Sequence, residues 1–159
     1  MAADHGSLWH RWSALSPAQR SLVVRAGFWL PVFSLAVKLV PLHRIMAVLG
    51  LHQGSLNGSP APADADADPA RVADVTRALT VVAARTPWTS TCLAQALAGA
   101  RLLHSTGLTA TVTLGVAKGP PGALEADSIL AHAWLDHGDV TVIGGARERR
   151  YLPVGRFLG

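Results

Sequence analysis

The spacing of apolar residues changes at Gly107, and this change limits the folds open to the chain. Before it, Leu93, Leu97 and Ala100 recur at intervals of three to four residues, which is typical of one face of an α-helix. After it, residues 108–116 alternate and are rich in β-branched side chains, as in a strand. The sequence therefore predicts an α+β fold in which this helix packs on a small sheet.

Three shorter segments complete the predicted antiparallel sheet. Residues 130–135 and 140–143 are strand-like, with a turn at His137-Gly138 between them. Residues 151–154 resemble a short return along the sheet. The strands are close in sequence, so we expect antiparallel pairing through tight connections.

The N-terminal part of the chain is expected to form apolar helices. Ser16 followed by Pro17 is a helix N-cap signature, and Pro31 is expected to end or kink the helix. Residues 26–42 contain one charge, Lys38, but a membrane span needs about 20 apolar residues without such an interruption. We therefore expect buried or interface helices and no membrane span.

Composition divides the chain into three parts. Residues 1–51 form the helical segment, and residues 52–68, rich in Gly, Ser, Pro and Ala-Asp repeats, are expected to be a flexible linker. The core is expected at residues 69–159, opening with a helix capped by Asp68 and started by Pro69. The linker aspartates lack the glycine turn and terminal glutamate of a calcium loop, so no metal site is predicted.

Charge and cysteine content exclude several classes of protein. The formal net charge is +4, and four arginines near the C-terminus are offset by Glu148 alone. No aromatic residues interleave with them, which favours a solvated tail over nucleic-acid binding. The single cysteine excludes an internal disulfide and a cysteine-based zinc cluster. With no cleavable signal visible, we expect a cytoplasmic protein without cofactor or metal. The four arginines are Arg147, Arg149, Arg150 and Arg156.

Cys92 and His132 are the candidate catalytic residues. Ser90 or Thr91 is expected to cap the helix that follows, which places the Cys92 sulfur in the first turn, at the positive end of the helix dipole. His132 lies between two alanines in an apolar strand, where burying an imidazole needs a reason. A thiol paired with an imidazole predicts acyl transfer, with the Cys92 N–H as oxyanion donor and the Trp88 indole as a candidate second donor.

Several short motifs around these two residues resemble the B2 proteins of lasso-peptide biosynthesis, which are related to transglutaminases and papain-like cysteine proteases. The resemblance covers about residues 70–155. The matching residues are Trp88, Cys92-Leu93, Gln95-Ala96-Leu97, Gly107, Leu114-Gly115-Val116 and His132-Ala133-Trp134.

The resemblance implies a transglutaminase-like or papain-like core and a leader peptidase activity. Such an enzyme cuts the leader from a ribosomally made precursor, which frees the amine that an ATP-dependent lasso cyclase uses. The implied partners are the precursor leader peptide, a small leader-recognition protein and the cyclase.

One position departs from the family pattern. The family often has a triad aspartate about twelve residues after the histidine, and here that position is Gly144. Asp136 is a poor substitute, because residues four apart on one strand are separated by about 13 Å. A carbonyl, a water or an acid from elsewhere is then left to hold His132.

Two alternative functions stay open at this point. The first is transglutaminase-like amide transfer, in which an amine captures the thioester. The second is a non-catalytic adaptor that docks a cyclase or a leader-recognition protein, with the missing aspartate as a sign of decay. The identity of the products would separate amide transfer from hydrolysis. Slow alkylation of Cys92 would favour the non-catalytic adaptor.

Overall fold

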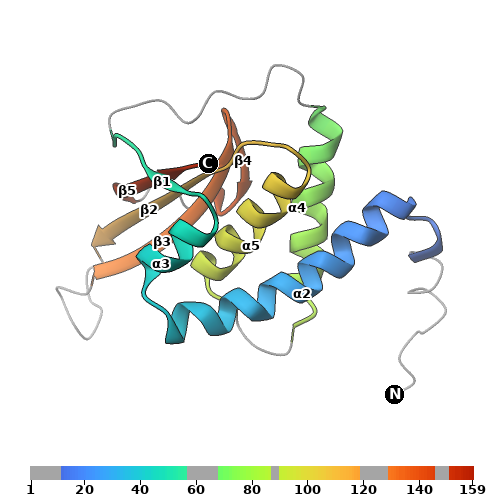
Figure 1. Ribbon diagram of the computed structural model, residues 1–159, viewed down its shortest axis with the longest axis horizontal. Coiled ribbons are helices and arrows are strands. Elements are labelled where there is room, and N and C mark those ends of the chain that lie inside the picture. Colours follow the sequence, from blue (N-terminus) through green and yellow to red (C-terminus); the bar gives the residue numbers. More distant parts are fainter. Residues whose placement is uncertain (1–11, 57–67, 87–89, 119–128, 146–150) are drawn as a thin grey trace.

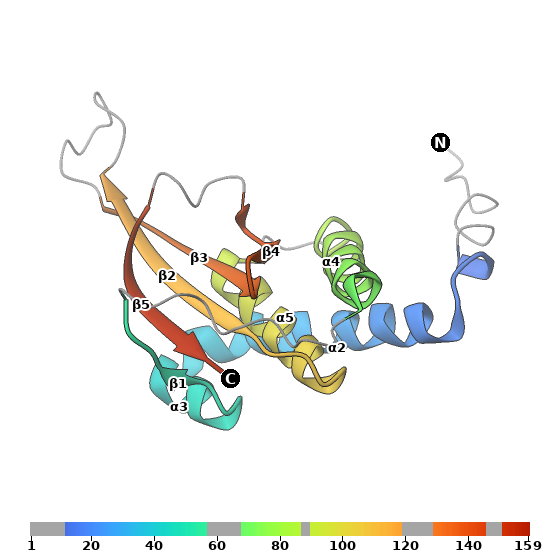
Figure 2. The same cartoon turned by 90° about the horizontal axis from the view of Figure 1, so that it is seen from above.

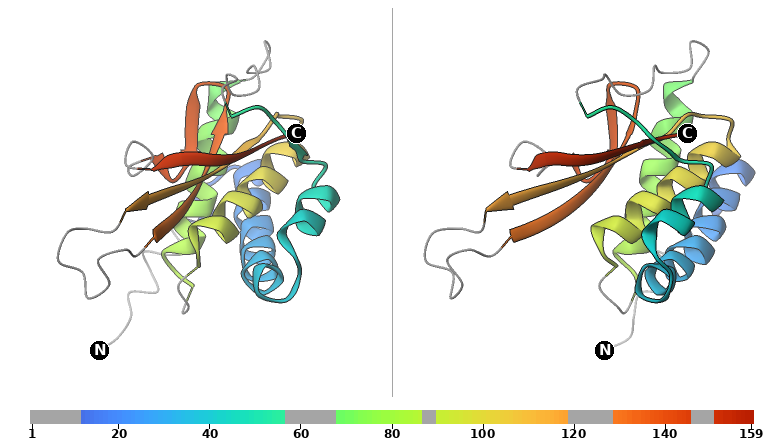
Figure 3. Two further views of the ribbon diagram at one scale, coloured as in Figure 1. Left: turned by 90° about the vertical axis from the view of Figure 1, so that its left-hand side faces the viewer. Right: turned by 60° about the vertical axis from the view of Figure 1, so that its left-hand side comes forward.

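A single antiparallel sheet packs on a group of helices in this protein (Figure 1). The computed structural model describes residues 12–56, 68–86, 90–118, 129–145 and 151–159. Helix α5 lies against the sheet, and α2 packs on both α5 and α4. The helices lie mainly to one side of the strands (Figures 2 and 3). The predicted α+β fold is confirmed.

Helix α2 spans Pro17–Leu39 and begins with the expected cap. The Ser16 side chain accepts a hydrogen bond from the Gln19 N–H, and the Gln19 side chain accepts one from the Ser16 N–H, forming a capping box. Pro31 was expected to end or kink this helix, and it lies inside the helix without ending it. Leu30 and Phe33, on either side of it, are buried in the core, and this packing offsets the backbone hydrogen bond that proline cannot donate.

A short helix and a short strand follow α2. Helix α3 spans Leu42–Val48, and strand β1 follows at His52–Gln53, which pairs with the last strand of the sheet. The first two residues of the expected 52–68 linker are therefore part of the sheet. Residues 57–67 lie outside the described part of the chain.

Both helices of the predicted core begin at expected N-caps. Helix α4 spans Pro69–Ala83, with the Asp68 side chain accepting a hydrogen bond from the Ala70 N–H. Helix α5 spans Cys92–Ser105 and closes at Gly107, whose φ is 77°. The Gly107 N–H donates to the His104 carbonyl and the Leu108 N–H to the Leu103 carbonyl, which is a Schellman motif.

The sheet has the strand order β1-β5-β2-β3-β4, and every neighbouring pair is antiparallel. The expected return strand lies inside the sheet, between β1 and β2. His137 ends β3, so the hairpin turn lies one residue later than expected, at Gly138-Asp139. The strands that accompany β1 are β2 Thr111–Lys118, β3 Ile129–His137, β4 Val140–Ile143 and β5 Leu152–Leu158.

One hydrophobic core joins the N-terminal helices to the rest of the molecule. Leu30 of α2, Leu97 of α5 and Leu135 of β3 are all fully buried in the same cluster. At Gly99 of α5 an added Cβ would collide with the Leu135 side chain, so the helix and β3 are in close contact. Among the described residues, helix and strand segments therefore share one interior.

Candidate active site

Cys92 occupies the first position of α5, as the sequence predicts. Of the two candidate caps, Thr91 is the one used: its side chain accepts a hydrogen bond of 3.2 Å from the Ala94 N–H. Ser90, the residue before this cap, is held by the Gln95 side chain, which donates hydrogen bonds to the Ser90 hydroxyl at 2.9 Å and to the Ser90 carbonyl at 3.2 Å. Cys92 is half-buried and packs against the core. Its local backbone is thus well supported.

His132 lies in β3, opposite Gly115 of β2, and is half-buried between aromatic rings. Its ring centroid is 4.9 Å from that of Tyr151 and 6.1 Å from that of Trp134. A Cβ on Gly115 would come within 2.7 Å of the Trp134 ring and 2.9 Å of the Tyr151 Cβ. The glycine therefore leaves the space into which these aromatic rings pack.

The ring of His132 is oriented by a main-chain carbonyl. Its Nε2 atom lies 3.1 Å from the carbonyl oxygen of Gly144. A carbonyl oxygen only accepts hydrogen bonds, so Nε2 must carry the proton and donate it. In the neutral ring this leaves Nδ1 as an unprotonated acceptor, which is the atom able to take a proton from a thiol.

Gly144 is held in a conformation that a side chain would disturb. Its φ is 94°, in the region that favours glycine. An added Cβ would lie 2.8 Å from the Cβ of Trp134 and 3.0 Å from the carbonyl oxygen of Ala133. An aspartate cannot be placed here on this backbone. The carbonyl of Gly144 reaches the imidazole at the position where the proteins that the motifs resemble often have an aspartate.

The two nearby acids lie elsewhere. The Asp136 carboxylate accepts a hydrogen bond of 2.9 Å from the Thr141 hydroxyl on the neighbouring strand. Asp139 is exposed in the hairpin turn. The hypothesis that Asp136 orients His132 is therefore wrong, because the distance along an extended strand separates the two side chains. Of the alternatives, the carbonyl is the one the structure shows.

The elements that carry Cys92 and His132 are neighbours. Helix α5 packs on β3, and its first turn lies beside that strand (Figures 1 and 2). Side chains alternate along a strand, so His132 shares a face with Trp134, while Leu135 points toward α5. His132 therefore lies on the face of β3 opposite the one that packs on α5, and the described contacts do not bring its ring to the Cys92 thiol. In the described part of the chain no hydrogen bond joins the two groups, so their catalytic pairing stays a prediction.

Several predicted features fall outside the described residues. Trp88, the candidate oxyanion donor, is among them, and so are Arg147, Arg149 and Arg150 of the basic cluster. Within the described ranges, no three His, Cys, Asp or Glu side chains are grouped so that they could hold a metal ion. The sequence reasoning gave no role to Tyr151, and its ring contact with His132 arises only through the sheet.

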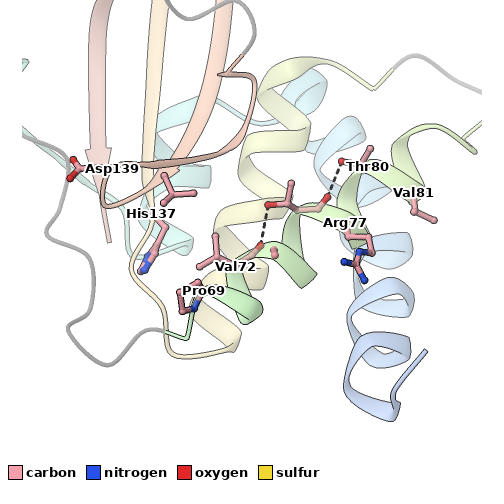
Figure 4. A pocket seen from close by; sticks show the side chains of 10 residues that line it. Pro69, Val72, Arg77, Thr80, Val81, His137 and Asp139 are labelled. Carbon is pink, nitrogen blue, oxygen red and sulfur yellow. Dashed lines mark hydrogen bonds between the residues drawn. The ribbon is translucent and has the colours of Figure 1, made fainter. Parts of the chain in front are cut away.

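A separate pocket of about 630 Å³ lies between α4 and the β3–β4 hairpin (Figure 4). Its walls are mainly apolar, and the hydroxyls of Thr76 and Thr80 are used within α4, donating to main-chain carbonyls one turn earlier. His137, at one end, is buried and donates through Nδ1 to the Thr109 carbonyl at 2.9 Å. Neither Cys92 nor His132 lines this pocket. It supplies no nucleophile, and we assign it no part in the reaction.

Comparison with known families identifies the superfamily to which this chain belongs. A family model described as the transglutaminase-like superfamily matches residues 36–156. The chain belongs to the transglutaminase-like superfamily. The matched range includes both Cys92 and His132, and members of the superfamily are usually cysteine-dependent enzymes with a papain-like or transglutaminase fold. No curated protein and no solved structure matches the chain.

Proposed function

We propose that this transglutaminase-like protein is a cysteine peptidase that removes the leader peptide from a ribosomally made lasso-peptide precursor. The observation that carries the proposal is the hydrogen bond from His132 Nε2 to the Gly144 carbonyl, because it leaves Nδ1 free to accept a proton. The position of Cys92 at the start of α5 supports the same chemistry, because the positive end of the helix dipole favours a thiolate. The route also requires the thiol to reach the face of β3 that carries His132. The resemblance in the motifs around both residues supplies the substrate class.

The proposed reaction follows the acyl-enzyme route. Cys92 transfers its thiol proton to Nδ1 of His132, and the thiolate attacks the scissile carbonyl, whose oxyanion accepts a hydrogen bond from the Cys92 N–H. The imidazolium then gives its proton to the departing amine of the core peptide, leaving the leader as a thioester. Water, deprotonated by Nδ1, hydrolyses the thioester, and the leader acid and free thiol are released.

The Gly144 carbonyl has a definite role in this route. The carbonyl accepts a hydrogen bond from the Nε2–H group in both the neutral and the charged form of the His132 ring. The ring therefore keeps its orientation throughout the cycle. A neutral carbonyl stabilises the imidazolium less than a carboxylate would, because a hydrogen bond between two charged groups is the stronger one. We therefore expect a working dyad that is slower than a complete triad, since triad members contribute unequally.

The partners follow from the same proposal. A small leader-recognition protein presents the precursor, and a lasso cyclase takes up the amine that cleavage frees. The motif resemblance around Cys92 and His132 is the support for both.

Cleavage of the precursor tests the proposed function directly. The full chain, its leader-recognition protein and the precursor are incubated, and the products are identified by mass spectrometry. Cys92→Ala should leave the precursor intact, whereas Ser105→Ala, at the opposite end of the same helix, should cleave normally. Normal cleavage by Cys92→Ala would remove the proposal.

The same experiment separates hydrolysis from amide transfer. Hydrolysis yields a leader that ends in a free acid, and transfer yields a leader joined to an amine. Alkylation by iodoacetamide tests the adaptor alternative on the protein alone: an activated thiolate reacts quickly at neutral pH, and a slow reaction would favour an inert thiol.

A further inference from the structure

The outward side of α2 carries an uncovered apolar stripe that plays no part in the proposed reaction. Four of its five members are between 58 % and 71 % exposed. Their spacing of three to four residues places them along one line of the helix, from its second turn to its end. The stripe consists of Val24, Phe28, Val32, Leu35 and Leu39.

The opposite side of the same helix is fully occupied. Leu22, Ala26, Leu30 and Phe33 are buried, and α2 packs there on α4 and α5. Among the described residues, α2 is the helix that is long and apolar enough to cross a membrane. Only 22 % of the residues in its most apolar stretch of 18 are buried. Val23, Trp29, Ala36 and Val37 are partly buried against the core, so the apolar surface that α2 leaves exposed is mainly the stripe.

The charges on α2 itself are of one sign, and Asp74 of α4 is an acid beside its first turn, where it accepts a hydrogen bond from Gln19. At 100° per residue, Arg25 and Lys38 project about 60–80° to either side of the centre of the stripe. The whole stretch from residue 5 to residue 63 contains no Asp or Glu, and it also carries Arg20 and Arg44. An apolar line with cations along both borders is the pattern of a helix that lies in a membrane interface.

We propose that the stripe on α2 binds the surface of an anionic lipid bilayer, with the helix lying in the plane of the membrane. The apolar side chains enter the boundary between headgroups and acyl chains, and Arg25 and Lys38 reach lipid phosphates. The helix does not cross the bilayer, because its inner side remains packed on α4 and α5. Charge complementarity favours a lipid surface over a protein partner, since α2 itself carries basic residues and no acid and so matches a uniformly negative plane.

Vesicle cosedimentation of the full-length protein tests this proposal without any substrate. The protein should bind vesicles of phosphatidylcholine mixed with phosphatidylglycerol, and bind phosphatidylcholine vesicles much more weakly. Raising the salt concentration should release the protein, because exposed charges are screened. Equal binding to both vesicles, or no binding to either, overturns the proposal. Resistance to release by high salt and alkaline carbonate, as for a spanning helix, overturns it as well.

Matched variants locate the binding surface. Leu39→Ser should weaken vesicle binding about tenfold, and Leu152→Ser should not, although the two leucines are equally exposed, at 71 % and 70 %. Leu152 lies on β5, away from α2 (Figure 1). Lys38→Glu should weaken binding by about fivefold or more, since each basic residue near an anionic surface contributes. Equal effects of the two leucine variants overturn the proposal.

Self-association is the outcome that would replace it. If size-exclusion chromatography with light scattering shows a dimer that Leu39→Ser dissociates, the stripe is an interface between two copies. A monomer with intact circular dichroism in every variant supports the lipid surface. None of these readouts depends on cleavage of a precursor, so the proposal stands or falls separately from the peptidase activity.

Discussion

The two residues of the proposed catalytic pair are held in place in different ways. Cys92 lies on a helix whose ends are closed by nearby residues, with the Thr91 cap at one and the Gly107 motif at the other. His132 is held by Gly144, twelve residues away, and by the ring of Tyr151, which directly precedes β5. A nucleophile on a capped helix thus depends on local signals, whereas the base depends on how strands come together. Substitutions around Cys92 and around His132 should therefore have different effects on cleavage and on the free energy of unfolding.

The largest effect is expected at the imidazole itself. His132→Ala should lower precursor cleavage about a thousandfold while leaving the fold intact, because the ring is only half-buried. His43→Ala, on the exposed side of α3, is the matched control. Cleavage rates and circular dichroism of both variants check this expectation, and an equal loss in both would contradict a catalytic role for His132.

The next largest effect is expected where the carbonyl is supplied. Gly144→Ala should lower the free energy of unfolding by about 2–4 kcal/mol, from the positive φ and from the contact with Trp134, and cleavage should fall as the carbonyl moves. Gly50→Ala also has a positive φ, 70°, but meets no atom within 4 Å, so it should cost only about 1–2 kcal/mol. Equal losses in urea unfolding would show that Trp134 does not confine Gly144.

A smaller effect is expected where the two regions touch. Gly99→Ala should lower the free energy of unfolding by about 1–3 kcal/mol, because its Cβ meets the buried Leu135 side chain between α5 and β3. Gly27→Ala, inside α2 with nothing within 4 Å, should instead raise it by about 0.5–1 kcal/mol. If both variants are stabilised, α5 and β3 are less closely packed than the structure indicates.

The smallest effect is expected at the helix cap. Thr91→Ala removes the side chain that accepts from the Ala94 N–H and should cost about 1 kcal/mol, while Thr91→Ser should restore most of it. Denaturant unfolding measures both. A cost above that of Gly144→Ala would reverse the comparison between the two ends, making the nucleophile's side the less tolerant one.

Much of the fold could be predicted because its signals are short. The caps at Ser16, Asp68 and Thr91 each involve residues two or three positions apart, and they mark the helix starts. The expectation that Pro31 could end the helix is wrong, because the cost of the proline is local, while the burial of Leu30 that offsets it is tertiary. Strand β1 was missed because two residues carry no period, and only pairing with β5 makes them a strand.

In the candidate site, too, some features follow from the sequence and others only from the tertiary structure. The residue types and neighbours of Cys92 and His132 are enough to predict them as candidates, and Gly144 stands out as a departure from the proteins that the motifs resemble. Its carbonyl as the partner of the ring could not be selected from the sequence, because every residue has a carbonyl and only the backbone path aims one of them.

By itself the sequence determined the helices, their caps, the switch to strands and the chemical identity of one thiol and one imidazole, because these depend on residue type and short spacing. Only the tertiary structure decided that Gly144 and Tyr151 surround His132, and that one side of α2 is buried while the other is left uncovered. Such contacts join residues far apart in the chain, and packing selects them among many that the same sequence pattern would allow.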